Sequence, residues 1–329
     1  MQQYIELVKH ILATGTRKEN RTGVDTISTF GYYFEHDLRN GFPLLTTKNV
    51  SWKNIVVEML WFLSGQTDIS ILKRHGCKFW DAWADENGKV PSAYGNFWRQ
   101  FPTHEGPMQY SSGGVTVEMP KGSPAYNDQI AWMLAELRRN PMSRRMVCSA
   151  WAPGNAQTSK LPPCHCLFML NVQNEEGPIP AVAVFDADGK QVPQQGLMTK
   201  RLCLSLTQRS CDTALGIPYN IASYALLLSI FSHLSGIEPG IFGHTLVDAH
   251  IYTGKPDGSM AEFDHIPGLK EQIARPVRPL PTLKISDSIK ELADIEKLMG
   301  PEVSTEEVMS HFVLDGYDPH PGINFKVAV

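Results

Sequence analysis

The sequence predicts an α+β domain built around one large β-sheet, and three observations support that prediction. Strand-like and helix-like segments follow one another without the regular alternation of a βαβ protein. The chain has 329 residues, of which 42% are hydrophobic and 19% charged, so it has neither the composition of a disordered chain nor too few residues for a substantial core. No internal repeat or long linker divides it, and we expect a single domain over residues 1–329.

The first half of the chain combines helices with one long strand. An amphipathic helix is expected over residues 2–13, and alternating polar and apolar residues indicate a strand over residues 26–38. Apolar residues recur at helical spacing through residues 50–64. A further amphipathic helix over residues 127–139 ends before Asn140-Pro141, a pair that favours the end of a helix.

The second half supplies most of the expected sheet. A long apolar helix is expected over residues 219–235, ended by Gly236, since glycine favours the position after a helix. Short runs that are apolar or alternate in polarity indicate strands, and they cover residues 146–151, 166–172, 201–208, 243–247 and 283–285.

Four stretches have the composition of surface insertions in this domain. Gly, Pro and polar residues dominate the first two, and the last carries a helix-capping signal at Ser304-Thr305-Glu306-Glu307. The insertions are expected near residues 104–126, 174–199, 253–263 and 286–311.

Charge and cysteine content narrow the function classes. A net charge of -4 argues against a protein that coats nucleic acid, because phosphate contacts require an excess of Lys and Arg. The six cysteines form no Cys-x-x-Cys pair, so we expect reduced thiols and a cytoplasmic location. The N-terminus lacks the pattern of a secretory signal. The apolar run 221–234 is too short and too polar to span a bilayer, so no membrane association is expected.

Cys164 follows a rigid Pro162-Pro163 corner and precedes a predicted strand. Strand ends present side chains to clefts, and a thiolate is a strong nucleophile. Cys164 is therefore a candidate nucleophile. The alternative is a buried cysteine beside a core histidine, His165, and the local sequence leaves both interpretations open.

Several arginines occupy turns and strand ends. Arg144 and Arg145 are adjacent just before a predicted strand, where their charges repel unless an anion or an acidic group lies between them. Arg209 ends another strand and Arg21 lies in a turn. Arginines so placed suit bidentate binding of a phosphate. The alternative for each one is an ordinary surface arginine.

Other polar residues stand in apolar surroundings. Glu58 lies in an apolar helix, where burial would raise its pKa and suit proton transfer, unless it faces a solvent-lined edge. Asn220 opens the long helix, and its amide both donates and accepts, as a pyrimidine edge requires. His250 and Tyr252 share one face of a strand. For Asn220, His250 and Tyr252, the alternative is core packing with one internal hydrogen bond each.

Taken together, these segments resemble the thymidylate synthase superfamily, which includes the deoxypyrimidine nucleotide hydroxymethylases. The resemblance runs along the whole chain apart from the four insertions. Its matching stretches include Arg21-Thr22-Gly23, Thr46-Thr47-Lys48, Glu58-Met59-Leu60-Trp61-Phe62, Ser143-Arg144-Arg145, Pro163-Cys164-His165, Gln208-Arg209-Ser210-Cys211-Asp212, Asn220-Ile221-Ala222-Ser223-Tyr224 and Gly316-Tyr317-Asp318-Pro319-His320-Pro321.

The resemblance implies a three-layer fold with one large mixed sheet, surrounding helices and a homodimer packed sheet to sheet. It also implies that dUMP is the substrate, because Asn at position 220 goes with uracil. Arg144 and Arg145 would reach the phosphate from the other subunit. The residues implied to bind the nucleotide are Arg21, Arg144, Arg145, Gln208, Arg209, Ser210, Asp212, Asn220, His250 and Tyr252.

The implied reaction transfers one carbon from 5,10-methylenetetrahydrofolate, the cosubstrate, and requires no metal. Cys164 would add to C6 of uracil, with Arg209 favouring its thiolate. Glu58, Tyr94 and His165 would order the water that removes the C5 proton. The residues implied to bind the folate are Lys48, Trp80, Trp83, Leu161, Asp212, Gly216, Tyr219 and Val329.

The chain departs from the usual synthase pattern mainly on the side of the transferred carbon. The departures are Asn49 for a basic residue, Ser92-Ala93 for Pro-Val, Ala152 for Asn and Val247 for Gly. They favour a hydroxymethylase, in which water captures the exocyclic methylene. The alternatives are a thymidylate synthase, in which folate supplies a hydride, and a catalytically impaired nucleotide- or RNA-binding protein.

Overall fold

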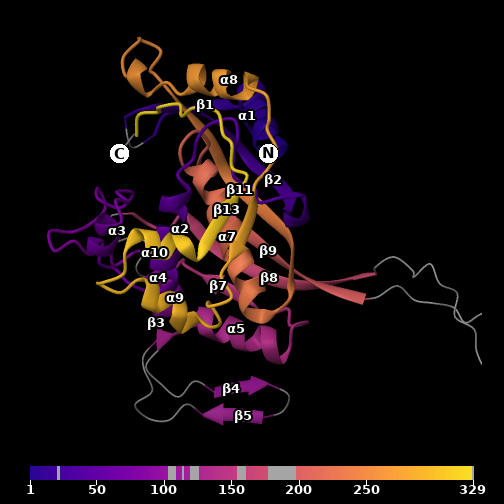
Figure 1. The fold of residues 1–329 in the computed structure, drawn as a ribbon. Helices are drawn as coiled ribbons and strands as arrows, with labels where there is room; N and C mark the ends of the chain where they lie inside the picture. The colour runs from indigo at the N-terminus through magenta and orange to yellow at the C-terminus, as the bar shows by residue number, and fades with distance from the viewer. Residues whose placement is uncertain are drawn as a thin grey trace, which may run out of the picture.

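The computed structural model describes residues 1–20, 23–102, 109–112, 115–118, 126–153, 161–176 and 198–327. Their largest element is a seven-stranded sheet with the order β1-β2-β11-β9-β8-β7, to which β10 adds by pairing with β11. The sheet is mixed, because β9 and β10 run parallel to β11 whereas the other neighbours are antiparallel. Its strands (Figure 1) are β1 (Thr16–Lys18), β2 (Asp25–Asp37), β7 (Val147–Ser149), β8 (His165–Glu176), β9 (Met198–Gln208), β10 (Cys211–Asp212) and β11 (Glu238–Thr253).

Helices and three two-stranded sheets complete the described part of the chain. The two-stranded sheets pair β3 (Phe101–Pro102) with β6 (Tyr126–Asn127), β4 (Gln109–Ser112) with β5 (Val115–Glu118), and β12 (Thr282–Ile285) with β13 (Phe312–Asp315). The helices are α1 (Gln2–Thr14), α2 (Trp52–Leu63), α3 (Ser70–Arg74), α4 (Tyr94–Arg99), α5 (Gln129–Arg139), α7 (Gly216–Ser235), α8 (Ile266–Ala274), α9 (Leu292–Leu298) and α10 (Thr305–Ser310), with 3-10 turns η1 (Leu38–Asn40) and η2 (Ala261–Phe263). The predicted α+β fold around one large sheet is confirmed.

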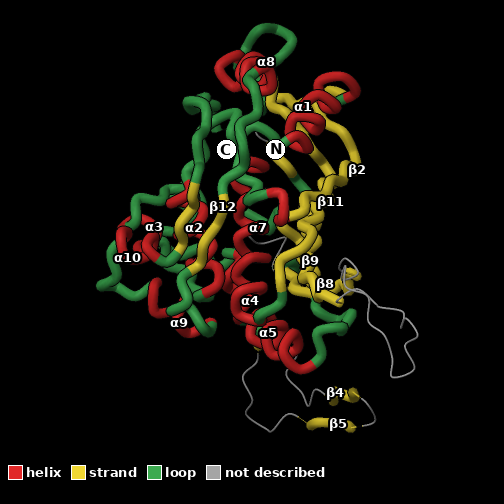
Figure 2. Tube along the Cα trace, turned by 45° about the vertical axis from the view of Figure 1, so that its right-hand side comes forward, coloured by secondary structure: helices red, strands yellow, loops and turns green. Residues whose placement is uncertain are grey.

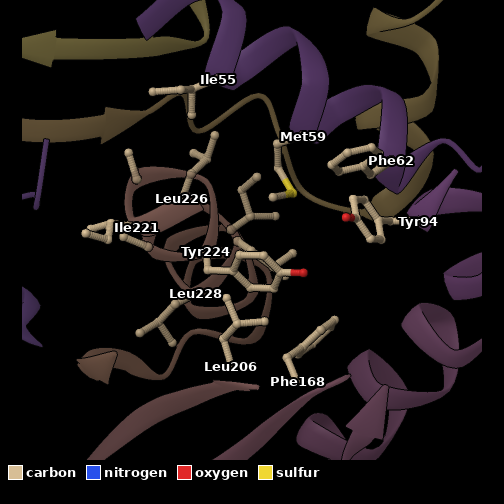
Figure 3. Close-up of a cluster of buried hydrophobic side chains, with 14 of the residues drawn as sticks. Ile55, Met59, Phe62, Tyr94, Phe168, Leu206, Ile221, Tyr224, Leu226 and Leu228 are labelled. Atoms are coloured by element: carbon tan, nitrogen blue, oxygen red, sulfur yellow. The ribbon is translucent and has the colours of Figure 1, made fainter. Parts of the chain in front are cut away.

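Helix α7 forms the centre of the core. It is apolar on nearly all sides, as expected of a helix buried all round, and it ends at Gly236, whose φ of 71° is readily adopted only by glycine. Figure 3 shows Tyr224 extending from this helix toward Tyr94 and Phe168. Helix α7 is long and apolar enough to cross a membrane, but 78% of its apolar window is buried inside the protein, which is the pattern of a core helix.

The two faces of the sheet differ. Along β8 and β9, alternate residues are buried beneath helices, and in the described part of the chain those helices lie on one side of the strands (Figure 2). The opposite face exposes large apolar side chains from three strands, namely Phe30 (87% exposed), Val147 (40%) and Met169 (40%). We call this surface the open sheet face. Large apolar side chains exposed on one face of a sheet are a feature of interaction surfaces.

The last two insertions contain short helices that pack against the rest of the domain. Residues 286–311 contain α9 and α10, and Ser304 caps α10 by accepting from the backbone N–H of Glu307, as its sequence predicts. Glu296 of α9 pairs with Arg99 at 2.7 Å, which ties this insertion to α4. Residues 253–263 contain η2. Most of insertions 104–126 and 174–199 lies outside the described residues.

Candidate active site

Cys164 lies where the chain enters the sheet. Strand β8 begins at the next residue, and the pairing of His165 with Gln208 places Cys164 opposite Arg209 on the neighbouring strand. The backbone N–H of Arg209 donates to the carbonyl of Cys164 at 2.9 Å. The backbone N–H of Cys164 donates to the hydroxyl of Tyr94 at 3.2 Å. The side chain is half-buried, so the interpretation as a wholly buried core cysteine is wrong.

Arg209 is held against the turn that carries Cys164. Its Nε donates to the carbonyl of Pro163 at 2.9 Å and a terminal nitrogen donates to that of Pro162 at 2.8 Å. The guanidinium also lies 5.6 Å from the ring centroid of Trp151, within the range of a cation–π contact. A fixed positive charge therefore lies beside the turn that carries Cys164. Burial raises the pKa of the neighbouring Cys166 thiol, and the Arg209 charge opposes that rise.

Tyr94 and His165 form an aromatic wall beside Cys164. Their rings are stacked, with centroids 4.5 Å apart and an interplanar angle of 8°, and Tyr224 meets His165 edge to face at 5.1 Å. Burial lowers the pKa of His165 to about 4, so its imidazole is neutral at neutral pH. Burial likewise raises the pKa of Tyr94. Both groups can therefore exchange hydrogen bonds with water or substrate without carrying a charge.

Glu58 projects from the middle of α2 toward the same wall. Its Oε1 accepts a hydrogen bond from the indole Nε1 of Trp80 at 2.7 Å, and Trp80 packs on Tyr94 with ring centroids 5.7 Å apart. Although part of the residue is accessible, desolvation of the carboxyl raises its pKa to about 7. A carboxyl that titrates near neutrality is suited to proton transfer, so the interpretation of Glu58 as a solvated residue is not supported.

Replacing Glu58 with Gln should therefore change both turnover and the pH dependence of stability. We expect kcat to fall by about 10²–10⁴-fold, the usual contribution of an acid–base group. The carboxyl titrates near 4.5 in the unfolded chain and near 7 when folded, so the wild-type protein loses stability as pH rises through that interval. Gln does not titrate. The Tm of Glu58→Gln should rise relative to wild type between about pH 4 and about pH 8; a constant difference would contradict the raised pKa.

Gln208 and Asn220 meet behind the aromatic wall. The amide Nε2 of Gln208 donates to Asn220 Oδ1 and to the backbone carbonyl of Ser210, each at 3.0 Å. The side chain of Asn220 also hydrogen-bonds with His165. The structure thus brings together the aromatic wall and the residue expected to read the base.

His250 and Asp212 are neighbours because β10 runs parallel to β11 and pairs them in register. The ring of His250 meets that of Tyr252 edge to face at 5.3 Å, so the two residues share one face, as predicted. Asp212 accepts from the backbone N–H groups of Ala214 (2.9 Å) and Leu215 (3.1 Å). These bonds shape the turn that leads into α7.

Several of the residues expected to bind folate lie around the start of α7. Lys48 is buried, donates to the carbonyl of Ala214 at 2.6 Å and has its pKa lowered to about 8 by desolvation. Gly216 is the first residue of α7, where an added Cβ would lie 3.4 Å from Asn220 Oδ1. Tyr219 packs on Phe79. Trp83 and Leu161 are partly buried against the core, and Val329 lies outside the described residues.

The C-terminal segment crosses this side of the site. Lys48 lies 4.8 Å from the ring centroid of Phe325, and His265 hydrogen-bonds to the carbonyl of Lys326 at 2.9 Å. The ammonium of Lys326 pairs with Glu262 at 3.2 Å and lies 4.5 Å from the ring centroid of Phe263. The insertion at 253–263 therefore holds the C-terminal segment near Lys48.

Arg144 and Arg145 are not part of this cluster within one chain. The backbone N–H of Leu170 donates to the carbonyl of Met146, so the arginine pair lies level with the middle of β8. Cys164 is six residues away along that strand, roughly 20 Å at the rise of an extended chain. Both arginines are exposed, and no ion pair involves them among the described residues. Arg21 lies outside those residues.

Sequence analysis missed three residues of this site. His244, Tyr224 and Phe325 were not singled out, although each touches a residue that was. A signal existed only for His244, which is a polar residue between Phe242 and Leu246 on the buried face of a strand. Tyr224 stood only inside a family-matching stretch without a role of its own, and Phe325 is an ordinary apolar residue until the fold places it.

No group of three or more His, Cys, Asp or Glu side chains suited to a metal ion occurs among the residues that the structure describes. Comparison with known families gives one match. A family model described as thymidylate synthase matches residues 2–329.

Proposed function

Because the chain belongs to the thymidylate synthase family, whose members transfer one carbon from methylenetetrahydrofolate to C5 of a pyrimidine nucleotide, we propose that it acts on dUMP through a covalent Cys164 adduct. The observation that supports this proposal most directly is the position of Cys164 between Arg209 and the wall of Tyr94 and His165. The catalytic and nucleotide-binding roles given to residues here are part of the same proposal.

In the proposed mechanism the Cys164 thiolate adds to C6, and C5 becomes an enolate-like nucleophile. The folate supplies the methylene that C5 receives. Glu58, with its pKa near 7, and neutral His165 order a water molecule that takes the C5 proton, while Tyr94 fixes the backbone of Cys164. Loss of that proton expels tetrahydrofolate and leaves the carbon as an exocyclic methylene on the pyrimidine. Expulsion of the thiolate from C6 at the end restores the C5=C6 bond and frees the enzyme.

We propose that the product is 5-hydroxymethyl-dUMP, formed when water adds to the exocyclic methylene before the thiolate leaves. The support is the set of departures beside the catalytic residues. Ala93 directly precedes Tyr94, Ala152 directly follows Trp151, on which Arg209 lies, and both are buried. Asn49 is exposed next to buried Lys48. In this proposal, the smaller side chains at Ala93 and Ala152 would leave more room for water near the reacting carbon.

Thymidylate synthase activity is the second candidate, and the C-terminal segment favours it. Phe325 lies over Lys48, and Lys326 is held by His265 and Glu262. A segment docked in this way would exclude water from the folate side, which a hydride transfer requires.

Incubating the protein with dUMP and methylenetetrahydrofolate separates the two candidates. We expect the nucleotide product to have the mass of the hydroxymethyl derivative, because water captures the methylene, and we expect no rise in dihydrofolate absorbance. Glu58→Gln serves as the control for protein-dependent turnover. A product with the mass of dTMP and a matching dihydrofolate signal would assign the synthase activity instead.

We propose that the active form is a cytoplasmic homodimer packed through the open sheet face, with no membrane or nucleic-acid partner. Two observations support the dimer. The open sheet face exposes Phe30 and Met169, and such apolar surface is stabilised by association. Arg144 and Arg145 are too far from Cys164 to serve the same site, but a symmetric partner would bring its own copies of them to it. Residues 1–329 would form one domain.

A further inference from the structure

A chain of three side chains runs from the base-reading position into the core. Gln208 donates through Nε2 to Asn220 Oδ1 and to the carbonyl of Ser210, so both amide protons are used. Its Oε1 lies on the other side, 3.0 Å from Nε2 of His244. His244 is fully buried on β11.

These contacts fix where His244 carries its proton. Gln208 Oε1 can only accept, so Nε2 of His244 must be the donor. Burial holds the pKa of His244 well below its usual range, which leaves a neutral ring with one proton, and Nδ1 has no hydrogen-bond partner among the described residues. Phe34 and Phe242 pack on the ring with centroids 5.4 and 5.5 Å away, so it cannot easily rotate.

The orientation of Asn220 matters because its amide has the same shape when turned by 180°, with donor and acceptor exchanged. Uracil presents an N–H donor at N3 and a carbonyl acceptor at C4. Cytosine presents an acceptor at N3 and an amino donor at C4. An Asn side chain that is free to turn would therefore accept either base, so its identity alone does not confer selectivity for uracil.

We propose that His244 is a positioning residue that locks the amide of Asn220, through Gln208, in the orientation that accepts uracil and rejects cytosine. If Asn220 turned, its NH₂ would face the NH₂ of Gln208. If Gln208 turned as well, its oxygen would face the carbonyl of Ser210, and His244 could accept from the turned NH₂ only by moving its proton to Nδ1, which has no hydrogen-bond partner among the described residues. Each alternative brings like groups together in a buried site, where an unmade hydrogen bond is costly. This inference rests on the proposed role of Asn220.

The test compares His244→Phe, which removes the donor, with His244→Gln, whose terminal NH₂ can reach the same point. Calorimetric titration with dUMP and dCMP gives the ratio of their Kd values for each protein. We expect the preference for dUMP to fall about tenfold or more in His244→Phe, the effect of losing one buried hydrogen bond, and to be largely restored in His244→Gln. An unchanged ratio in a His244→Phe protein that retains its fold by circular dichroism would overturn the relay.

A second measurement does not depend on substrate or on the variants. Nitrogen-15 NMR of the free wild-type protein should show His244 as the neutral tautomer protonated on Nε2, and protonation on Nδ1 or on both nitrogens would overturn the relay. The outcomes also separate this inference from the proposed function. A wild-type protein that does not prefer dUMP over dCMP would overturn the proposed function, whereas a preference that survives in His244→Phe overturns the relay alone.

Discussion

Cys164→Ala should lose turnover by at least about 10⁴-fold, the scale of loss when an enzyme's nucleophile is removed. Alanine cannot form the bond to C6, so C5 is never activated. Binding of dUMP should change little, because the groups proposed to hold the phosphate, sugar and base are untouched. Steady-state assays of nucleotide product and calorimetric titration with dUMP would measure the two effects separately.

Cys166→Ala provides the matched control. Cys166 lies two residues further along β8, is also half-buried and has its thiol 3.6 Å from the carbonyl of Cys164. Its loss removes a thiol of the same type from the same strand but should leave kcat within a few fold of wild type. If turnover survived in Cys164→Ala but disappeared in Cys166→Ala, the nucleophile would be Cys166 and the proposed role of Cys164 would be wrong.

Mixing Arg144→Ala with Cys164→Ala should restore activity that neither variant has alone. In the mixed dimer, the site containing Cys164 receives Arg144 from the other chain and is complete, whereas the second site lacks both residues. Random assortment makes half of the dimers mixed, each with one working site, so about a quarter of wild-type activity is expected. The measurement is product formation after the two proteins are unfolded and refolded together.

Two controls are needed. In the first, each variant is refolded alone. In the second, the double variant Arg144→Ala/Cys164→Ala is mixed with Cys164→Ala. In that second mixture no site has its thiol, so it should stay inactive. If the first mixture also stays inactive although analytical separation shows mixed dimers, each site is built from one chain and the proposed interface role of Arg144 is wrong.

The fold could be predicted where apolar periodicity is strong and uninterrupted. The expected helix at 2–13 corresponds to α1 (Gln2–Thr14), and the strand at 26–38 corresponds to β2 (Asp25–Asp37). By contrast, β11 spans Glu238–Thr253 as one strand, although strand was expected only over residues 243–247 and around His250 and Tyr252. Pro239, Gly240 and Gly243 interrupt its pattern, and only pairing with β2 and β9 on either side keeps this segment extended.

The candidate active site could be predicted less completely than the fold. Local sequence marked Cys164, Glu58 and the arginine pair as unusual, and the family resemblance gave them roles. Sequence alone could not show that Trp80 bonds to Glu58, because the contact joins segments that only the fold brings together. It also could not place Arg144, because the site that Arg144 is proposed to complete belongs to a second chain.

The open sheet face has a consequence for newly made protein. A newly synthesised chain exposes this apolar face until another molecule covers it. Exposed apolar surface of this kind promotes aggregation and binding by chaperones. If two copies pair through this face, as proposed, the lifetime of a new chain would depend on how quickly it meets another copy. At a high rate of synthesis, new chains would pair quickly and be protected. At a low rate of synthesis, more of them would be degraded before they could pair.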